Sequence, residues 1–184
     1  MKRVERSELL DFATFEDERA ALLPRVLAEK AARRVHVGEY LTFLFENAVT
    51  LRWQVQEMMR AERLVREKDI QHELDTYNEL LGGPGELGCT LLVEIEDERE
   101  RAEKLRRWTA LPDHVYARLA DGTRVAARVD DRQRILEKLS SVQYLKFPVG
   151  GAVPVAIGCD FAELRAETAL TAEQRAALRA DLAS

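Results

Sequence analysis

The chain has 184 residues, 46% of them hydrophobic and 33% charged, which is enough apolar material for one folded domain over residues 1–184. Its 28 basic and 33 acidic side chains give a net charge of −5, and an overall negative field opposes binding to nucleic-acid phosphates. No apolar run approaches the ~20 residues that a membrane span needs, and Met1 to Phe15 show no secretory leader. We therefore expect neither a nucleic-acid partner nor a membrane.

The N-terminal third is predicted to be helical. Thr14 and Asp17 resemble a capping box that starts a helix running to Arg34. Pro24 inside this helix should kink or divide it, because proline lacks the amide hydrogen that the helix needs.

From Val35 the hydrophobic pattern changes to that of strands. Residues 40–46 and 51–56 both alternate, so a β-hairpin is favoured, with helix from Val49 as the alternative. Good helix formers then predict a helix over 57–64. A further helix is predicted from about Asp69 until the breaker cluster Gly82-Gly83-Pro84-Gly85.

The remaining elements alternate between strands and helices. They predict an α+β fold with a mostly antiparallel sheet built from hairpins, packed with N-terminal, central and C-terminal helices. The predicted elements are a strand at 89–96, a helix at 97–108, a hairpin of 114–119 with 123–129 about Asp121-Gly122, a short helix at 132–139, strands at 141–149 and 153–159, and a helix that Thr171 caps.

Common catalytic and metal-binding motifs are absent from the sequence. His36, His72 and His114 have no ligand partner at metal spacing, and there is no nucleophile elbow or Walker loop. Cys89 and Cys159 form no CxxC pair and fall on apolar faces of predicted strands, so we expect buried, unreactive thiols in a reducing cytoplasm. We expect no metal site, and the sequence leaves open whether the protein is an enzyme and which cofactor it uses.

Polar side chains are densest between Arg52 and Asn78. Glu57 and Arg60 lie three apart and Glu73 and Tyr77 four apart, so each pair shares one helix face. If the two helices pack, these groups form either a structural polar network or a small-ligand site. In such a site Arg60 would hold an anionic group, and Glu57 or Glu73 would act as general base. The candidate ligand-binding residues are Gln56, Glu57, Arg60, Glu73, Tyr77 and Asn78.

Five segments together carry a family resemblance: 45–47, 54–63, 73–78, 90–96 and 138–147. With them the chain resembles an uncharacterised bacterial family, catalogued as domain of unknown function 3501. The two helical segments, Gln-Val-Gln-Glu-Met-Met-Arg-Ala-Glu-Arg and Glu-Leu-Asp-Thr-Tyr-Asn, are the most specific.

The resemblance implies a small cytoplasmic protein, often encoded beside rubrerythrin-like and iron–sulfur proteins. It therefore implies a redox or peroxide-defence setting and a redox protein as partner. The sequence departs from the family pattern at Gln143, where a histidine is usual, and in the region Cys159-Asp160-Phe161, which lacks a further histidine. These departures weaken any metal or proton-transfer role for those positions.

Two functional hypotheses follow. The first is a non-enzymatic accessory or interaction protein of a redox enzyme, which an exposed apolar patch would support. The alternative is a small-ligand-binding protein or enzyme with a polar site on the central helices, which a pocket lined by the six candidate residues would support.

Overall fold

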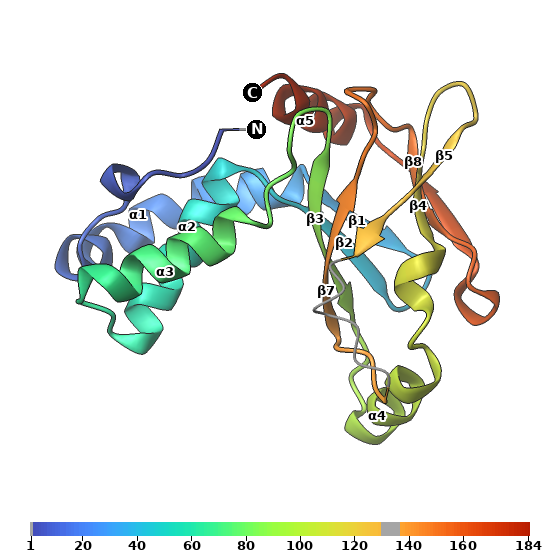
Figure 1. Ribbon diagram of the computed structural model, residues 1–184, viewed down its shortest axis with the longest axis horizontal. Helices are drawn as coiled ribbons and strands as arrows, with labels where there is room; N and C mark the ends of the chain where they lie inside the picture. Colours follow the sequence, from blue (N-terminus) through green and yellow to red (C-terminus); the bar gives the residue numbers. More distant parts are fainter. Residues whose placement is uncertain (1, 130–136) are drawn as a thin grey trace.

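The structure is a computed structural model that describes residues 2–129 and 137–184. A layer of helices packs beside a body built mostly of strands, and the two termini lie close together (Figure 1). The predicted α+β class is confirmed, and every strand pair in the described part of the chain is antiparallel. The helical layer contains α1 (Phe12–Ala31), α2 (Ala48–Glu62) and α3 (Glu67–Asn78), after a short turn of 3₁₀ helix, η1 (Arg6–Glu8).

The strands form two sheets. The five-stranded sheet has the order β1-β2-β3-β7-β6, and the four-stranded sheet has the order β5-β4-β8-β9. The strands are β1 (Arg34–Val37), β2 (Leu41–Phe45), β3 (Leu87–Val93), β4 (Val115–Arg118), β5 (Arg124–Ala126), β6 (Arg128–Val129), β7 (Val142–Phe147), β8 (Ala156–Cys159) and β9 (Ala166–Ala169).

The two sheets together form a flattened barrel. On one side the chain passes from β5 into β6 through Ala127, whose amide donates to the Val115 carbonyl. On the other side the Thr168 hydroxyl of β9 donates to the His36 carbonyl of β1 over 2.7 Å. The inward side chains of both sheets make the main apolar core, because strand residues alternate between two faces. This core includes Phe43, Phe45, Leu91, Phe147, Ile157 and both cysteines.

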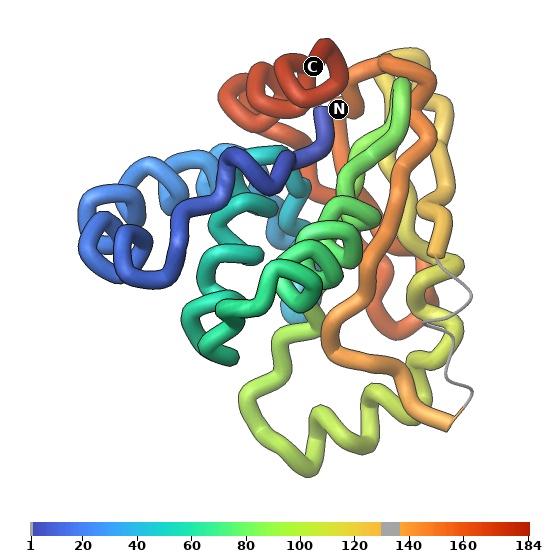
Figure 2. The backbone as a smooth tube through the Cα atoms, turned by 60° about the vertical axis from the view of Figure 1, so that its left-hand side comes forward, coloured from blue at the N-terminus to red at the C-terminus, as the bar shows by residue number. Residues whose placement is uncertain are grey.

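Two further helices contribute to the same core. These are α4 (Glu98–Arg107), followed by the turn η2 (Leu111–His114), and α5 (Ala172–Ala183). They bring Leu105 and Leu178 into the core, and they lie at opposite ends of the strands in Figure 1. Turned by 60°, the molecule shows the N-terminal helices stacked on one side of the strands (Figure 2). None of the described helices has the length and apolar character that crossing a bilayer requires.

The interpretation of residues 51–56 as a strand is wrong, and the helical alternative is correct. Asn47 accepts hydrogen bonds from the amides of Val49 and Thr50, which starts α2 at Ala48, three residues after β2 ends. This helix is buried on two sides. Leu51, Val55 and Met59 face one apolar cluster and Trp53 faces another, so a two-sided helix imitates the alternation of a strand. The predicted hairpin instead forms between β1 and β2.

Helix α1 begins and ends differently from the prediction. Asp11, not Thr14, is the N-cap residue, and its carboxylate accepts from the amides of Ala13 and Thr14. The helix continues through Pro24 without a break and ends at Ala31, because the chain must turn there into β1.

Most later elements agree with the prediction. β4 and β5 form the hairpin at Asp121-Gly122, where Gly122 has a φ of +88°. The Thr171–Gln174 capping box starts α5. The sequence does not predict β9, whose residues alternate only between exposed and half-buried positions. Of the helix predicted at 132–139, residues 132–136 lie outside the described part and 137–139 are not helical.

A buried ion pair joins the helical layer to α5. The Arg33 guanidinium donates from Nε and Nη2 to the two carboxylate oxygens of Asp181, both over 2.8 Å. Nη1 donates to the carbonyl and the carboxylate of Glu29. Glu29 also accepts from the side-chain amide of Asn47, the residue that caps α2. The guanidinium therefore links α1 to α5, and Glu29 extends the same network to the cap of α2.

Asp181→Ala should lower the free energy of unfolding by about 3–5 kcal/mol, because it leaves the buried Arg33 guanidinium without its main counter-ion. Urea unfolding followed by circular dichroism measures the change. Asp17→Ala is the matched control, since Asp17 is exposed on α1, and it should leave stability unchanged. Equal effects of the two substitutions would contradict the role of the ion pair.

Candidate functional site

Two of the six residues predicted as a site hold the N-terminal segment. The Asn78 side-chain amide accepts from the Val4 amide and donates to the Val4 carbonyl, both over 2.9 Å. The Gln56 side chain makes the same two-point contact with the backbone of Leu10, over 2.5 and 3.2 Å. Both amides are buried, so their hydrogen-bonding groups are engaged by the chain itself. We call residues 2–11 the N-terminal strap.

The other four lie on two different helix surfaces. Glu57 and Arg60 meet over 3.4 Å, as predicted from their spacing, and Arg19 of α1 binds Glu57 over 2.6 Å. Glu73 and Tyr77 lie on α3, where burial and the nearby carboxylate of Glu73 contribute to a raised pKa of the Tyr77 phenol. The neighbouring side chain of Gln54 on α2 acts in the opposite direction and lowers this pKa. The six residues therefore do not converge on one cavity within the described chain.

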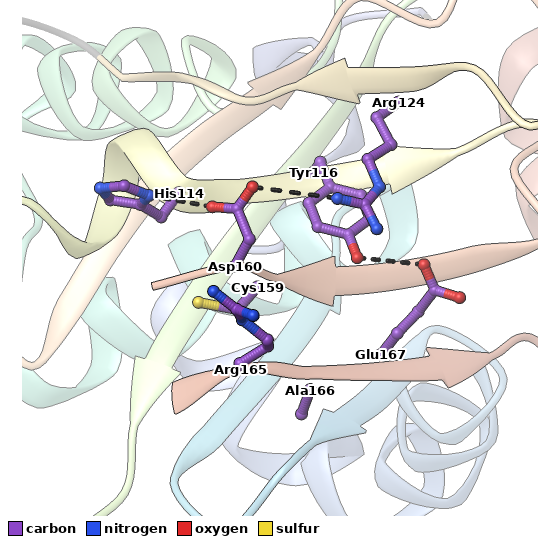
Figure 3. Close-up of a pocket in the computed structure, with 8 residues that line it drawn as sticks. All are labelled: His114, Tyr116, Arg124, Cys159, Asp160, Arg165, Ala166 and Glu167. Atoms are coloured by element: carbon purple, nitrogen blue, oxygen red, sulfur yellow. Dashed lines mark hydrogen bonds and ion pairs between the residues drawn. The ribbon is translucent and has the colours of Figure 1, made fainter. Parts of the chain in front are cut away.

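A polar pocket of about 670 Å³ lies on the four-stranded sheet (Figure 3). It lies where β4 begins, β8 ends and β9 begins, and the connection from β8 to β9, which holds the turn η4 (Ala162–Leu164), borders it. The sheet register explains this gathering, because Tyr116 of β4, Gly158 of β8 and Glu167 of β9 stand side by side on neighbouring strands. The pocket is lined by His114, Tyr116, Arg124, Cys159, Asp160, Arg165, Ala166 and Glu167.

A stack of groups forms one wall of the pocket. The Tyr116 ring lies directly over Gly158, where a Cβ atom would come within 2.5 Å of the ring. Only glycine leaves room for this ring position. The Arg124 guanidinium lies 4.3 Å from the centre of the Tyr116 ring, a cation–π contact. The Tyr116 hydroxyl donates to Glu167, so the ring is fixed at both its face and its tip.

The two carboxylates of the pocket already have cationic partners. Glu167 accepts two hydrogen bonds from Arg118, over 3.0 and 3.1 Å, and these bonds with Arg118 are the main cause of its lowered pKa. Asp160 accepts from Nδ1 of His114 over 2.9 Å and lies 4.0 Å from Arg124. Because an ionised carboxylate only accepts, Nδ1 carries the proton, which leaves Nε2 as the second functional nitrogen.

Among the described residues, Arg165 is the cation of the pocket for which no counter-ion is present. In Figure 3 dashed lines join the other charged groups but none reaches its guanidinium. Within residues 2–129 and 137–184, no acceptor binds this exposed side chain. Arg118, which lies outside the pocket lining, pairs with Glu167, and Arg124 lies 4.0 Å from Asp160. Among the described residues, the charge of Arg165 is therefore the one left unpaired in the pocket.

The Cys159 thiol borders the pocket but belongs to the barrel interior. Burial raises the pKa of this thiol, and burial raises the pKa of the Cys89 thiol even further. Both cysteines are free and buried, as predicted. A raised pKa keeps both thiols protonated. Because the thiolate is the reactive form, neither cysteine is activated as a nucleophile. Across the described residues, no group of three potential ligands could hold a metal ion.

Sequence reasoning missed this pocket because its residues come from four separate segments. His114 and Asp160 are 46 positions apart, and only the pairing of β4 with β8 brings them together. Gly158 was the available local signal, since a glycine inside a predicted strand often marks a close approach of another group.

The chain belongs to the family described as "Protein of unknown function (DUF3501)", whose profile matches residues 3–182. It is also similar to a crystal structure of a novel protein of unknown function from Burkholderia pseudomallei K96243. That similarity has a TM-score of 0.91 and 32% sequence identity, and it covers 98% of this chain and 100% of the other. No curated protein matches. The predicted family is therefore confirmed, and the relatives bring no activity with them.

Both thiols should resist alkylation in the folded protein. With iodoacetamide at about pH 8, Cys89 and Cys159 should react at least roughly tenfold more slowly than in the urea-unfolded chain, because burial disfavours the thiolate. Mass spectrometry of the labelled peptides measures each rate. Fast labelling of Cys159 in the folded chain would show that its thiol is open to the pocket.

Glu167→Gln should change how stability depends on pH. The lowered pKa of Glu167 means that its ionised carboxylate is favoured in the folded state. Ionised Glu167 therefore stabilises the folded protein at pH values above the usual pKa of glutamate, and this stabilisation is lost as the pH falls. The wild type should therefore lose more stability than the variant between about pH 7 and about pH 4. Urea unfolding across that range is the measurement. Glu173→Gln, on an exposed position of α5, should behave like the wild type.

Proposed function

We propose that the chain binds a small anionic molecule, a carboxylate or a phosphate, in the pocket between β4, β8 and β9. The supporting observation is the Arg165 guanidinium, which lines the pocket without a partner in the described chain. The neighbouring carboxylates are already bonded to other side chains, so the Arg165 guanidinium can bind an anion from solution. Its planar N–H donors form paired hydrogen bonds with the oxygens of a carboxylate or a phosphate.

The surrounding charges support the same ligand class. Glu167 is paired with Arg118, and Asp160 lies 4.0 Å from Arg124 and accepts a hydrogen bond from His114. Both carboxylates therefore oppose an incoming anion less than free carboxylates would. Arg124 is fixed on the Tyr116 ring and offers a second positive group across the pocket. The volume of about 670 Å³ falls within the range of small-molecule sites.

This proposal retains the ligand-binding alternative but moves the site away from the central helices. The large hydrophobic side chains exposed in the described chain are scattered over three regions: Phe12 and Leu27 on α1, Val65 between α2 and α3, and Val142 and Tyr144 on β7. Scattered apolar side chains are ordinary for a protein surface, whereas an accessory protein would favour one contiguous patch.

The redox protein as partner and the cytoplasmic location remain predictions. The redox protein, rubrerythrin-like or iron–sulfur, is implied by the family resemblance alone. A cytoplasmic location is consistent with two buried, free cysteines.

Arg165→Ala should weaken anion binding by roughly tenfold or more, because a charge-assisted hydrogen bond to an anion is lost. The experiment is an NMR titration of the ¹⁵N-labelled chain with inorganic phosphate and, separately, with acetate. Amides of residues 114–116 and 158–167 should shift and saturate in the wild type with at least one of the two anions.

Arg179→Ala is the matched control, since Arg179 is an exposed arginine of α5 outside the pocket. It should bind like the wild type. Absence of saturable shifts with both anions, or equal weakening by the two substitutions, would overturn the proposed function.

A further inference from the structure

A second cleft, separate from the first pocket, lies between the helical layer and the five-stranded sheet. One wall is the last turn of α3 and the loop that leads into β3, and the other is formed by β6 and β7. Its volume is about 1030 Å³. We propose that this cleft binds an organic phosphate that carries an apolar or aromatic ring.

The strand register places two cations opposite each other in the cleft. Arg128 of β6 and Lys146 of β7 are direct partners in the antiparallel ladder, so their side chains project from the same face. Like charges in this position repel each other unless an anion lies between them. Arg128 is paired with Glu86, but no partner for the half-buried Lys146 exists among the residues that the structure describes.

The N-terminal strap brings a third cation to the cleft. Asn78 fixes the backbone of Val4 through two buried hydrogen bonds, and the neighbouring Arg3 lines the cleft. In the described part of the chain Arg3 has no ion-pair partner either. Among the described residues that line the cleft, three cations, Arg3, Arg128 and Lys146, accompany two acids, Glu79 and Glu86.

Apolar groups lie beside these cations, and they favour a ligand that carries an apolar or aromatic ring. Tyr144 lies two residues before Lys146 on β7, so both side chains point to the same face of the strand. Tyr144 as a residue remains 37% exposed. Leu80 and Pro84 line the cleft from the opposite side. A ligand with a ring between these groups and a phosphate at Lys146 would match both the apolar surface and the charge.

The test is an NMR titration of the full ¹⁵N-labelled chain with phenyl phosphate, the simplest probe that has both parts. Amides of residues 76–86 and 144–146 should shift and saturate. Inorganic phosphate and phenol, each offering one part, should bind more weakly at these positions. Lys146→Ala should weaken phenyl phosphate binding by roughly tenfold, the loss of one charge-assisted contact.

Lys68→Ala, at an exposed lysine of α3 outside the cleft, is the matched control and should bind like the wild type. Arg3→Ala is a second test variant, because Arg3 is exposed and its loss should not disturb folding. Arg165→Ala separates the two sites, since it should leave the shifts at 76–86 intact. Shifts confined to 114–116 and 158–167, no saturation at 76–86, or equal binding by Lys146→Ala and Lys68→Ala would overturn the inference.

Discussion

The guanidinium of Arg33 lies where α1 ends and β1 begins, and it is almost completely removed from water. A buried charge is tolerated only when its hydrogen bonds are satisfied, and Arg33 meets this condition through Asp181 and Glu29. Glu29 in turn binds Asn47, the cap of α2. The helical layer, the first strand and the C-terminal helix are therefore oriented relative to one another by one connected polar network.

The same constraint accounts for the N-terminal strap. Val4 and Leu9 fill the apolar cluster between α2 and α3, and their segment needs partners for its backbone groups. Asn78 and Gln56 supply these partners from the two helices. Two of the polar residues that the sequence suggests as a ligand site, Gln56 and Asn78, thus bind the N-terminal strap instead. In doing so they place Arg3 at the cleft beside β7.

Both proposed sites lie on the outer surface of the barrel, where strand pairing sets the spacing of charges. On the smaller sheet, Gly158 lets the Tyr116 ring lie flat, and the ring supports Arg124. On the larger sheet, the register places Arg128 opposite Lys146. In both places a cation lacks an anion within the described chain: Arg165 in the first, and Lys146 and Arg3 in the second. The barrel interior, by contrast, holds apolar side chains and two thiols of raised pKa.

The sequence by itself determined the α+β class, the family, the hairpin at Asp121-Gly122, the cap at Thr171 and the contact of Glu57 with Arg60. These features depend on local spacing, turn chemistry or whole-chain similarity, which a linear sequence contains. It misassigned residues 51–56 because a helix buried on two sides shows the period of a strand. Only the tertiary structure decided that Gln56 and Asn78 face the strap, and that His114, Asp160 and Arg165 border one pocket. The physical reason is that these contacts join residues 46 or more positions apart through strand register and helix packing, which no local pattern encodes.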